Sequence, residues 1–345
     1  MKTLISIITP TYNQSAFIKQ CIESVLSQTF TNWEMIVVDD CSSDNTRDVV
    51  TNYVLKDKRI KLIKHKNNWG IKRLMKTYNQ ALHFSHGEYI AILEGDDFWP
   101  KDKLEIGLKS FKNKNVVLGY GDWIMTDGEG IPIKVGNYRK YNKNLLNNNP
   151  TGSISRLFAN PYFFLTTPTI MIEKKALVSI GGFKADKYYP FVDIPTILFL
   201  SLTGEFSYQQ HILGYYRKQK NSSWFKFAAE TNSMGRDEVQ KCITHFLAKH
   251  KNILPKDLNL NISEKNSKKN HVFAAFLHYI LFNEYKKAVK IAKIIEKDKN
   301  SSRFSKVLAN ILLITKPVNK YIYKSYFYVM IFIYKIKSID VFDNK

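Results

Sequence analysis

Four short apolar runs in the first hundred residues alternate with amphipathic segments, and this alternation sets the fold class. Each run has the length of a buried strand, and the segments between them repeat apolar residues at helical spacing. Strands that alternate with helices build a mostly parallel sheet covered by helices on both faces. Strands are expected at 3–8, 33–38, 60–64 and 89–93, and helices at 15–28, 44–54 and 72–85.

The rest of the chain is less regular. A polar, Asn-rich stretch over 136–150 is expected to be a mobile loop. Alternation stops after Trp224, which predicts an α/β domain over 1–223 and a basic, all-α domain over 224–345. Further strands are expected at 116–120 and 167–172, helices at 194–201, 236–249, 271–282 and 284–297, and a polar linker at 257–270.

Basic residues outnumber acidic ones, and the excess is uneven. The chain has 52 Lys and Arg against 30 Asp and Glu, a net charge of +22. Residues 1–220 carry +9 and residues 221–345 carry +13. A basic tail suits an anionic membrane surface, a polyanionic acceptor or nucleic acid. Compositional drift in a chain rich in Lys, Asn, Ile and Tyr is an equally good explanation.

Cysteine usage and hydropathy bear on the compartment. Cys21, Cys41 and Cys242 are scattered, which argues against a disulfide framework and suits a reducing environment. The first residues do not read as a signal peptide, and no stretch offers the roughly 20 apolar residues of a spanning helix. We therefore expect a cytoplasmic protein, with peripheral contact at the inner face of the cell membrane as one option.

Acidic residues follow two of the predicted strands. Asp39 and Asp40 end the second strand, and Glu94, Asp96 and Asp97 follow the fourth. Ligands of such sheets bind at the carboxyl ends of the strands. Carboxylates at this spacing can hold Mn²⁺ or Mg²⁺, which would neutralise a diphosphate leaving group. The alternative is that these residues only cap the following helices.

Other catalytic templates are missing from the sequence. It contains no GxxxxGK[ST] phosphate loop, no GxGxxG fingerprint, no GxSxG elbow and no HExxH pair. Each histidine is therefore expected to be structural or on the surface.

An ordered set of motifs resembles the family 2 inverting glycosyltransferases with a GT-A fold. The similarity covers about residues 3–223 and rests on the order and spacing of the motifs. They are Ser6–Asn13 (SIITPTYN), Ser24–Thr29 (SVLSQT), Val37–Asp44 (VVDDCSSD), Gly87–Ile90 (GEYI), Glu94–Asp97 (EGDD), Gly181–Phe183 (GGF), Asp193, Tyr215–Arg217 (YYR) and Ser222–Ser223.

The resemblance implies a nucleotide site. Pro10 and Tyr12 would line the base, with Tyr12 near its ring. Asp40 would accept a hydrogen bond from N3–H of uracil or thymine, because a carboxylate accepts and does not donate. The family's diphosphate arginine is replaced by Tyr78, so Arg73 or Lys76 would take its place.

The resemblance also implies a metal ligand and a base. Glu94 would lie near the ribose, Asp96 would be the main metal ligand, and Asp97 would lie beside it. Asp193 would remove the proton of the acceptor hydroxyl during one inverting displacement. Asp193 could instead cap the helix that follows, and the two roles are compatible. Gln219 stands where the family often has a histidine ligand, which implies a weaker metal site.

The aromatic-rich segment 317–339 is predicted to lie on a membrane surface. If it is helical, Lys320, Lys324 and Lys335 fall within about 60° of one another. Aromatic side chains at headgroup depth with lysines reaching phosphates suit an interfacial helix. Packing against the preceding helices or against a second subunit is the alternative, so an oligomer is compatible with the sequence.

The leading hypothesis is transfer of a sugar, from UDP-sugar most favourably, to a surface glycan or lipid-linked acceptor. No QxxRW segment follows the matched region, which argues against a processive synthase. A sugar nucleotidyltransferase would need a Gly-rich phosphate loop that residues 10–14 lack. A catalytically silent domain acting as a membrane or partner adaptor is the second hypothesis. No recognised nucleic-acid-binding module is present, and nucleic acid is not expected as a partner.

Overall fold

The computed structural model describes residues 3–158, 163–219, 222–231, 236–254, 285–297, 306, 309 and 310. The chain forms two compact units. The first comprises Met1–Lys226 with Glu238–Asn261, and the second comprises Phe227–Asp237 with Ile262–Lys345. The predicted linker, the predicted helix at 271–282 and the segment 317–339 lie outside the described residues and stay predictions.

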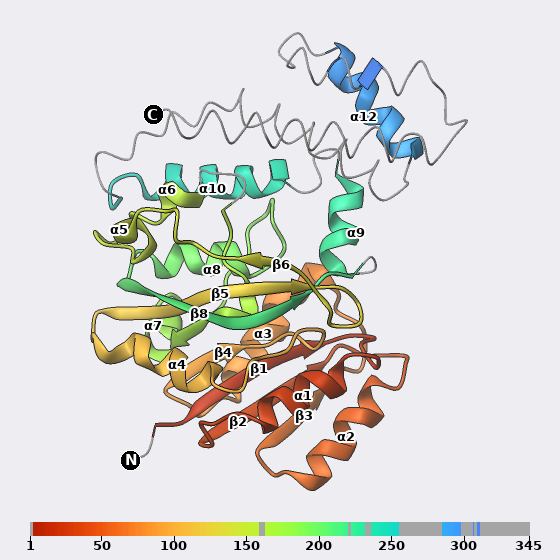
Figure 1. Cartoon of the computed structure of the whole chain (residues 1–345), viewed down its shortest axis with the longest axis vertical. Helices are drawn as coiled ribbons and strands as arrows, with labels where there is room; N and C mark the ends of the chain where they lie inside the picture. The colour runs from red at the N-terminus through yellow and green to blue at the C-terminus, as the bar shows by residue number, and fades with distance from the viewer. Residues whose placement is uncertain are drawn as a thin grey trace. The chain divides into compact units, whose positions relative to one another are not determined.

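The first unit is built on an eight-stranded mixed sheet (Figure 1). Strands β3, β2, β1 and β4 are neighbours in this order and run parallel, and β7 joins β4 in the opposite direction. β5 pairs antiparallel with β7 and β6, and parallel with β8. The strands are β1 (Ile5–Thr11), β2 (Trp33–Asp39), β3 (Ile60–Lys64), β4 (Tyr89–Ile92), β5 (Val116–Thr126), β6 (Pro132–Gly136), β7 (Met171–Glu173) and β8 (Glu205–Arg217).

Helices cover both faces of the parallel half of this sheet, as predicted. One face packs Ile5 and Ile7 of β1 against helices α1 (Ile18–Leu26) and α2 (Thr46–Lys56). Successive side chains of a strand point to opposite faces, so Ile8 faces the other layer. That layer holds α3 (Leu74–His83), which contacts β1 and β2. Both layers are apolar, which is why the parallel strands are nearly continuous hydrophobic runs.

Short helices complete the first unit. Helix α10 packs on α8 through the rings of Phe246 and Phe199, whose centroids lie 5.3 Å apart. The helices are α4 (Lys103–Lys109), α5 (Lys143–Leu146), α6 (Ser155–Phe158), α7 (Lys174–Ser179) and α8 (Asp193–Leu200), with 3₁₀ turns η1 (Ile71–Arg73), η2 (Ser110–Lys112) and η3 (Thr167–Thr169). Helices α9 (Ser223–Glu230) and α10 (Arg236–His250) each contain residues of both units.

In the second unit the structure describes helix α12 (Tyr285–Lys297). Ile291, Ala292 and Ile295 are buried, whereas Lys290 and Lys293 are exposed. The helix is therefore amphipathic, as its sequence predicts. Within the described part of the chain, no helix has the length and hydropathy needed to cross a membrane.

The stretch 136–150, expected to be a mobile loop, is only partly irregular: residues 137–142 and 147–150 lie outside helices and strands. This stretch includes the end of β6 and helix α5, and Asn148 is fully buried. The Asn148 amide donates to the carbonyls of Ser201 and Gly204, both at 2.7 Å, and accepts from the Ile154 N–H at 3.1 Å. Asn148 thus satisfies buried backbone groups, whereas Asn142, Asn144 and Asn149 are exposed, and a polarity count cannot distinguish these two situations.

The structure differs from the sequence prediction at two further strands. The predicted strand at 167–172 is divided between η3, which contains Pro168, and the short β7. The long β8 was not predicted as a strand, because its buried and exposed residues do not alternate regularly. Its pairing with β5 contains register shifts, and these bulges break the period of two on which a sequence pattern depends.

Candidate active site

The acidic loop Glu94–Asp97 lies just beyond the carboxyl end of β4. One carboxylate oxygen from each of Glu94, Asp96 and Asp97 lies within 4.8 Å of the others. Between them, the Gly95 N–H donates to the carbonyl of Pro10 at 3.1 Å. A Cβ on Gly95 would come within 2.7 Å of the Thr11 hydroxyl oxygen, so only glycine allows the loop to press this closely on β1.

Both carboxylate oxygens of Glu94 accept hydrogen bonds from within the protein. Tyr78 donates its hydroxyl to Oε1 at 2.5 Å, and Thr167 of η3 donates to Oε2 at 3.2 Å. Burial raises the pKa of Glu94, and these two hydrogen bonds oppose that rise. Tyr78 is fully buried, so it fixes Glu94 and is not placed as a phosphate ligand.

Arg217, the last residue of β8, ties the acidic loop to the rest of the site. Its backbone N–H donates to Asp97 Oδ1 at 2.8 Å, and its Nε donates to the Asp96 carbonyl at 2.7 Å. The guanidinium also donates to the Gly128 carbonyl at 2.7 Å and to the Gln20 side chain. It lies over the ring of Phe98, 5.2 Å from the centroid. One buried cation therefore holds residues that are more than a hundred positions apart in sequence.

The acidic cluster is chemically suited to a divalent cation. Burial, with the nearby charge of Glu94, raises the pKa of Asp96 to about 7, and burial raises the pKa of Asp97 well above its ordinary value. Asp97 Oδ2 is buried and has no hydrogen-bond partner among the described residues. Three crowded oxygen ligands, one of them unsatisfied, fit a hard cation such as Mg²⁺ or Mn²⁺.

Gln219 contacts this cluster through its nitrogen. Its Nε2 donates to Asp96 Oδ2 at 2.8 Å. Because only the amide oxygen could ligate a cation, this orientation makes Gln219 a hydrogen-bond donor to the cluster and not one of its oxygen ligands.

Asp193 begins helix α8 and is half-buried. Its Oδ2 accepts a hydrogen bond from the Tyr189 hydroxyl at 3.3 Å. Its Oδ1 is buried with no hydrogen-bond partner in the part of the chain that the structure describes. Burial raises the pKa of Asp193 to about 6, and the charge of Glu94 contributes to the rise. A carboxylate with one oxygen that lacks a hydrogen-bond partner and with a raised pKa can accept a proton near neutral pH.

The two aspartates that end β2 differ in their surroundings. Asp39 is fully buried, and its Oδ2 accepts from both Arg47 Nε and a terminal guanidinium nitrogen, at 3.1 and 2.9 Å. Asp40 is the next residue, and its side chain is 12% exposed. Asp39 therefore has a structural role in its ion pair with Arg47. Of the two carboxylates, Asp40 is the more exposed and the better candidate for contact with a ligand.

The other predicted nucleotide residues lie on neighbouring elements. Tyr12 follows β1 and is 42% exposed, which leaves its ring free to cover a base. Pro10 is buried within β1, and its carbonyl accepts a hydrogen bond from the acidic loop. It therefore positions that loop and does not line the site itself. Arg73 is exposed and immediately precedes α3. Neither a contact with the acidic loop nor one with Asp40 is present for the Arg73 side chain among the described interactions.

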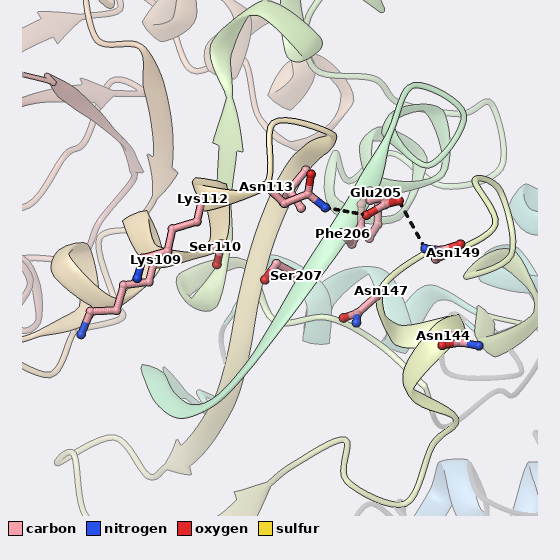
Figure 2. A pocket seen from close by; sticks show the side chains of 11 residues that line it. Lys109, Ser110, Lys112, Asn113, Asn144, Asn147, Asn149, Glu205, Phe206 and Ser207 are labelled. Carbon is pink, nitrogen blue, oxygen red and sulfur yellow. Dashed lines mark hydrogen bonds between the residues drawn. The ribbon is translucent and has the colours of Figure 1, made fainter.

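A cavity of 270 Å³ lies at the opposite end of β5 and β8. Figure 2 shows Asn113 and Asn149 on either side of Glu205, and both amides donate to its carboxylate, at 3.0 and 3.2 Å. Glu205 begins β8, whereas Arg217 ends it beside the acidic loop. This polar cavity is therefore not part of the acidic site.

The fold and this site define the class of protein. The solved structure of the mannosyltransferase PcManGT from Pyrobaculum calidifontis, in complex with GDP-Man and Mn²⁺, aligns over 99% of this chain and 88% of its own. The TM-score is 0.55 and the sequence identity 16%. This likeness shows the fold, which is of the GT-A type.

The sequence profile of Glycosyl transferase family 2 matches residues 6–181, half of the chain, and the chain belongs to this family. Two curated relatives are UDP-Glc:alpha-D-GlcNAc-diphosphoundecaprenol beta-1,3-glucosyltransferases of Escherichia coli. WfgD is 38% identical over 167 residues, 47% of this chain and 64% of its own. WfaP is 38% identical over 120 residues, 35% of this chain and 46% of its own. The matches thus span less than two thirds of these relatives.

Several functional contacts were not predicted from the sequence. The pairing of Tyr78 with Glu94 was missed because Tyr78 was considered only as the loss of an arginine. Arg217 was noted as a motif residue, but its hold on Asp96 and Asp97 depends on β8, which was not predicted. The tyrosine at position 189 gave no signal, since its contact with Asp193 follows from the shape of one loop.

Replacement of Arg217 by lysine is expected to destabilise the protein even though the charge is kept. A single ammonium group cannot replace a fork that binds three acceptors, so the free energy of unfolding should fall by about 2–4 kcal/mol. Denaturant unfolding measures this. Arg139→Lys is the matched control, because the Arg139 side chain is 63% exposed and 3.8 Å from Asp122. Equal losses in both variants would contradict the structural role of Arg217.

Proposed function

We propose that this chain is an inverting glycosyltransferase that uses a nucleotide-sugar donor, with a UDP-sugar favoured. The observation that carries the proposal is the set of three carboxylates at the end of β4, held by Arg217 and Tyr78. Its position at the carboxyl ends of parallel strands is where such sheets bind their ligands. Family membership and the GT-A fold support the same activity.

The donor site would be formed by residues on both sides of β1. Tyr12 would cover the base, and Asp40 would accept its N–H group. Glu94 would lie near the ribose, and Asp96 with Asp97 would hold Mn²⁺ or Mg²⁺, which when bound neutralises the leaving diphosphate. Arg73, which is exposed and immediately precedes α3, is proposed as the additional phosphate contact.

Asp193 would be the general base. Its open Oδ1 would take the proton of an acceptor hydroxyl while that oxygen attacks the anomeric carbon and the nucleoside diphosphate leaves. One displacement inverts the configuration at that carbon. The Tyr189 hydroxyl donates to the other oxygen, Oδ2, which supports Oδ1 as the oxygen that would take the proton.

The relatives indicate the substrate class. WfgD and WfaP are named for UDP-glucose and for a diphosphoundecaprenol-linked acceptor. We therefore propose a UDP-hexose donor and a glycan or lipid-linked acceptor, which would place the protein at the cytoplasmic membrane surface. PcManGT binds GDP-Man on the same fold, so the fold by itself does not determine the base.

A silent adaptor is the second candidate. Tyr78 and Gln219 motivated it, because each replaces a residue that family members often use. Tyr78 now has a role in fixing Glu94, and Gln219 contacts Asp96. With Asp193 open and the acidic cluster complete, an active enzyme accounts better for these contacts.

Nucleotide binding should depend on the metal and on Asp96. Calorimetry with UDP is expected to show affinity at least tenfold higher with Mn²⁺ than without it, because the cation joins the diphosphate to the acidic cluster. Asp96→Asn should remove most of this gain, whereas Asp102→Asn, an exposed carboxylate beside α4, should not. UDP affinity that is the same with and without Mn²⁺ would argue against the metal site.

Asp193→Asn should lower kcat with a UDP-sugar by about 10²–10⁴-fold and leave UDP binding within twofold of wild type. The base must be ionised, and burial raises its pKa from 3.8 to about 6. Turnover should therefore be complete above pH 7 and fall about tenfold per pH unit below 6. A flat profile between pH 5 and 7, or an active Asp193→Asn variant, would exclude Asp193 as the base.

A further inference from the structure

His65 is a buried histidine whose two ring nitrogens form hydrogen bonds with Asp40 and Gln80. It follows β3 directly, and its side chain is 2% exposed. Its Nδ1 lies 2.7 Å from Asp40 Oδ1, and its Nε2 lies 2.7 Å from Gln80 Oε1. The ring stacks on Trp69, with the centroids 3.9 Å apart and an interplanar angle of 27°. The two hydrogen bonds and the stacking on Trp69 together fix the position of the His65 ring.

The loop from His65 to Gly70 wraps the Asp40 carboxylate. The Trp69 N–H donates to Oδ1 and the Gly70 N–H to Oδ2, both at 2.8 Å. Gly70 has a φ of +59°, a left-handed conformation that glycine adopts readily. Asn68 donates to the Asp40 carbonyl at 2.9 Å, which closes the loop on its target.

The hydrogen bonds that Asp40 receives can be compared with the number that a carboxylate is able to accept. Its two oxygens offer about four lone-pair sites. Oδ1 takes His65 and Trp69, and Oδ2 takes Gly70. Among the described hydrogen bonds, three sites are used, and the one that stays available is on Oδ2. Asp40 is therefore presented to a ligand as a single acceptor of fixed direction.

The proton on His65 follows from the same accounting. An ionised carboxylate only accepts, so Nδ1 carries the hydrogen that Asp40 receives. The Gln80 amide offers both an oxygen and an NH₂ group, so it can satisfy Nε2 with or without a proton. The hydrogen bond from Nδ1 to Asp40 therefore does not depend on which group of the Gln80 amide faces Nε2.

We propose that His65 is a specificity-determining positioning residue that makes Asp40 select nucleobases presenting an N–H group. Uracil and thymine present N3–H to the open acceptor on Oδ2. Cytosine presents a lone pair at N3, which would leave both acceptors unpaired and in repulsion. A site built to accept a hydrogen bond rejects an analogue that cannot donate one. The inference rests on the proposed donor site and concerns its base selectivity.

Two substitutions of His65 separate this role from simple packing. His65→Phe keeps a ring that can stack on Trp69 and removes both nitrogens. His65→Asn gives up the ring and keeps an amide donor near the place of Nδ1. The readout is calorimetric affinity for UDP and for CDP, each with Mn²⁺, on full-length protein whose folding is checked by thermal unfolding.

The wild type is expected to prefer UDP to CDP. In His65→Phe the UDP affinity should fall about tenfold and the UDP-to-CDP ratio by a similar factor, because Asp40 loses the donor that aligns it. His65→Asn should keep the ratio within about threefold of wild type. His83→Phe, the same change at an exposed position at the end of α3, should alter neither value.

The outcomes distinguish base recognition by Asp40 from the role of His65 in positioning Asp40. A wild type that binds UDP and CDP equally would overturn base recognition by Asp40 and this inference with it. A selective wild type with an equally selective His65→Phe variant would overturn the role of His65 alone. If His65→Phe does not fold, His65→Leu removes the same Nδ1 donor, and an unchanged UDP-to-CDP ratio there would equally contradict the proposal.

Discussion

The crowding of three carboxylates in one buried loop is the constraint on which the rest of this site depends. Two ionised carboxylates within 4.8 Å repel each other by about 3.5 kcal/mol or more at an effective dielectric constant of about 20. Arg217 supplies one positive charge and fixes the loop, and burial, with the charges of the neighbouring carboxylates, raises the pKa of Asp96 and of Asp97 against its effect. In the function proposed above, a divalent ion would reduce this repulsion and join the cluster to an anionic ligand.

The sheet brings these groups together from distant parts of the chain. β1, β2 and β4 are parallel, so Tyr12, Asp40 and Glu94 all follow the same edge. β8 then returns alongside β5 and delivers Arg217 and Gln219 to that edge from far along the sequence. The parallel half of the sheet thus supplies the nucleotide side of the proposed site, and the mixed half supplies the groups that hold the acidic loop.

The sequence predicted the parallel half well because its signals are local. The apolar runs that became β1 to β4 and the acids that follow them are visible without any long-range contact. The mixed half was predicted less well, since β8 is bulged and Asn148 is polar yet fully buried. Partner choice was the least predictable: His65 was expected to be structural or on the surface. Its contact with Asp40 depends on the register of β2 against β3, which pairs Asp39 with Lys64 and which only the folded chain shows.

Crystallography of the protein with UDP and Mn²⁺, with anomalous data collected at the manganese absorption edge, tests the central claim most directly. The account predicts an anomalous peak about 2.0–2.6 Å from a carboxylate oxygen of Asp96. It also predicts that the diphosphate lies on that ion and that the base lies between Tyr12 and Asp40. Bound UDP with no manganese at the cluster, or manganese and nucleotide together at another place, would contradict it.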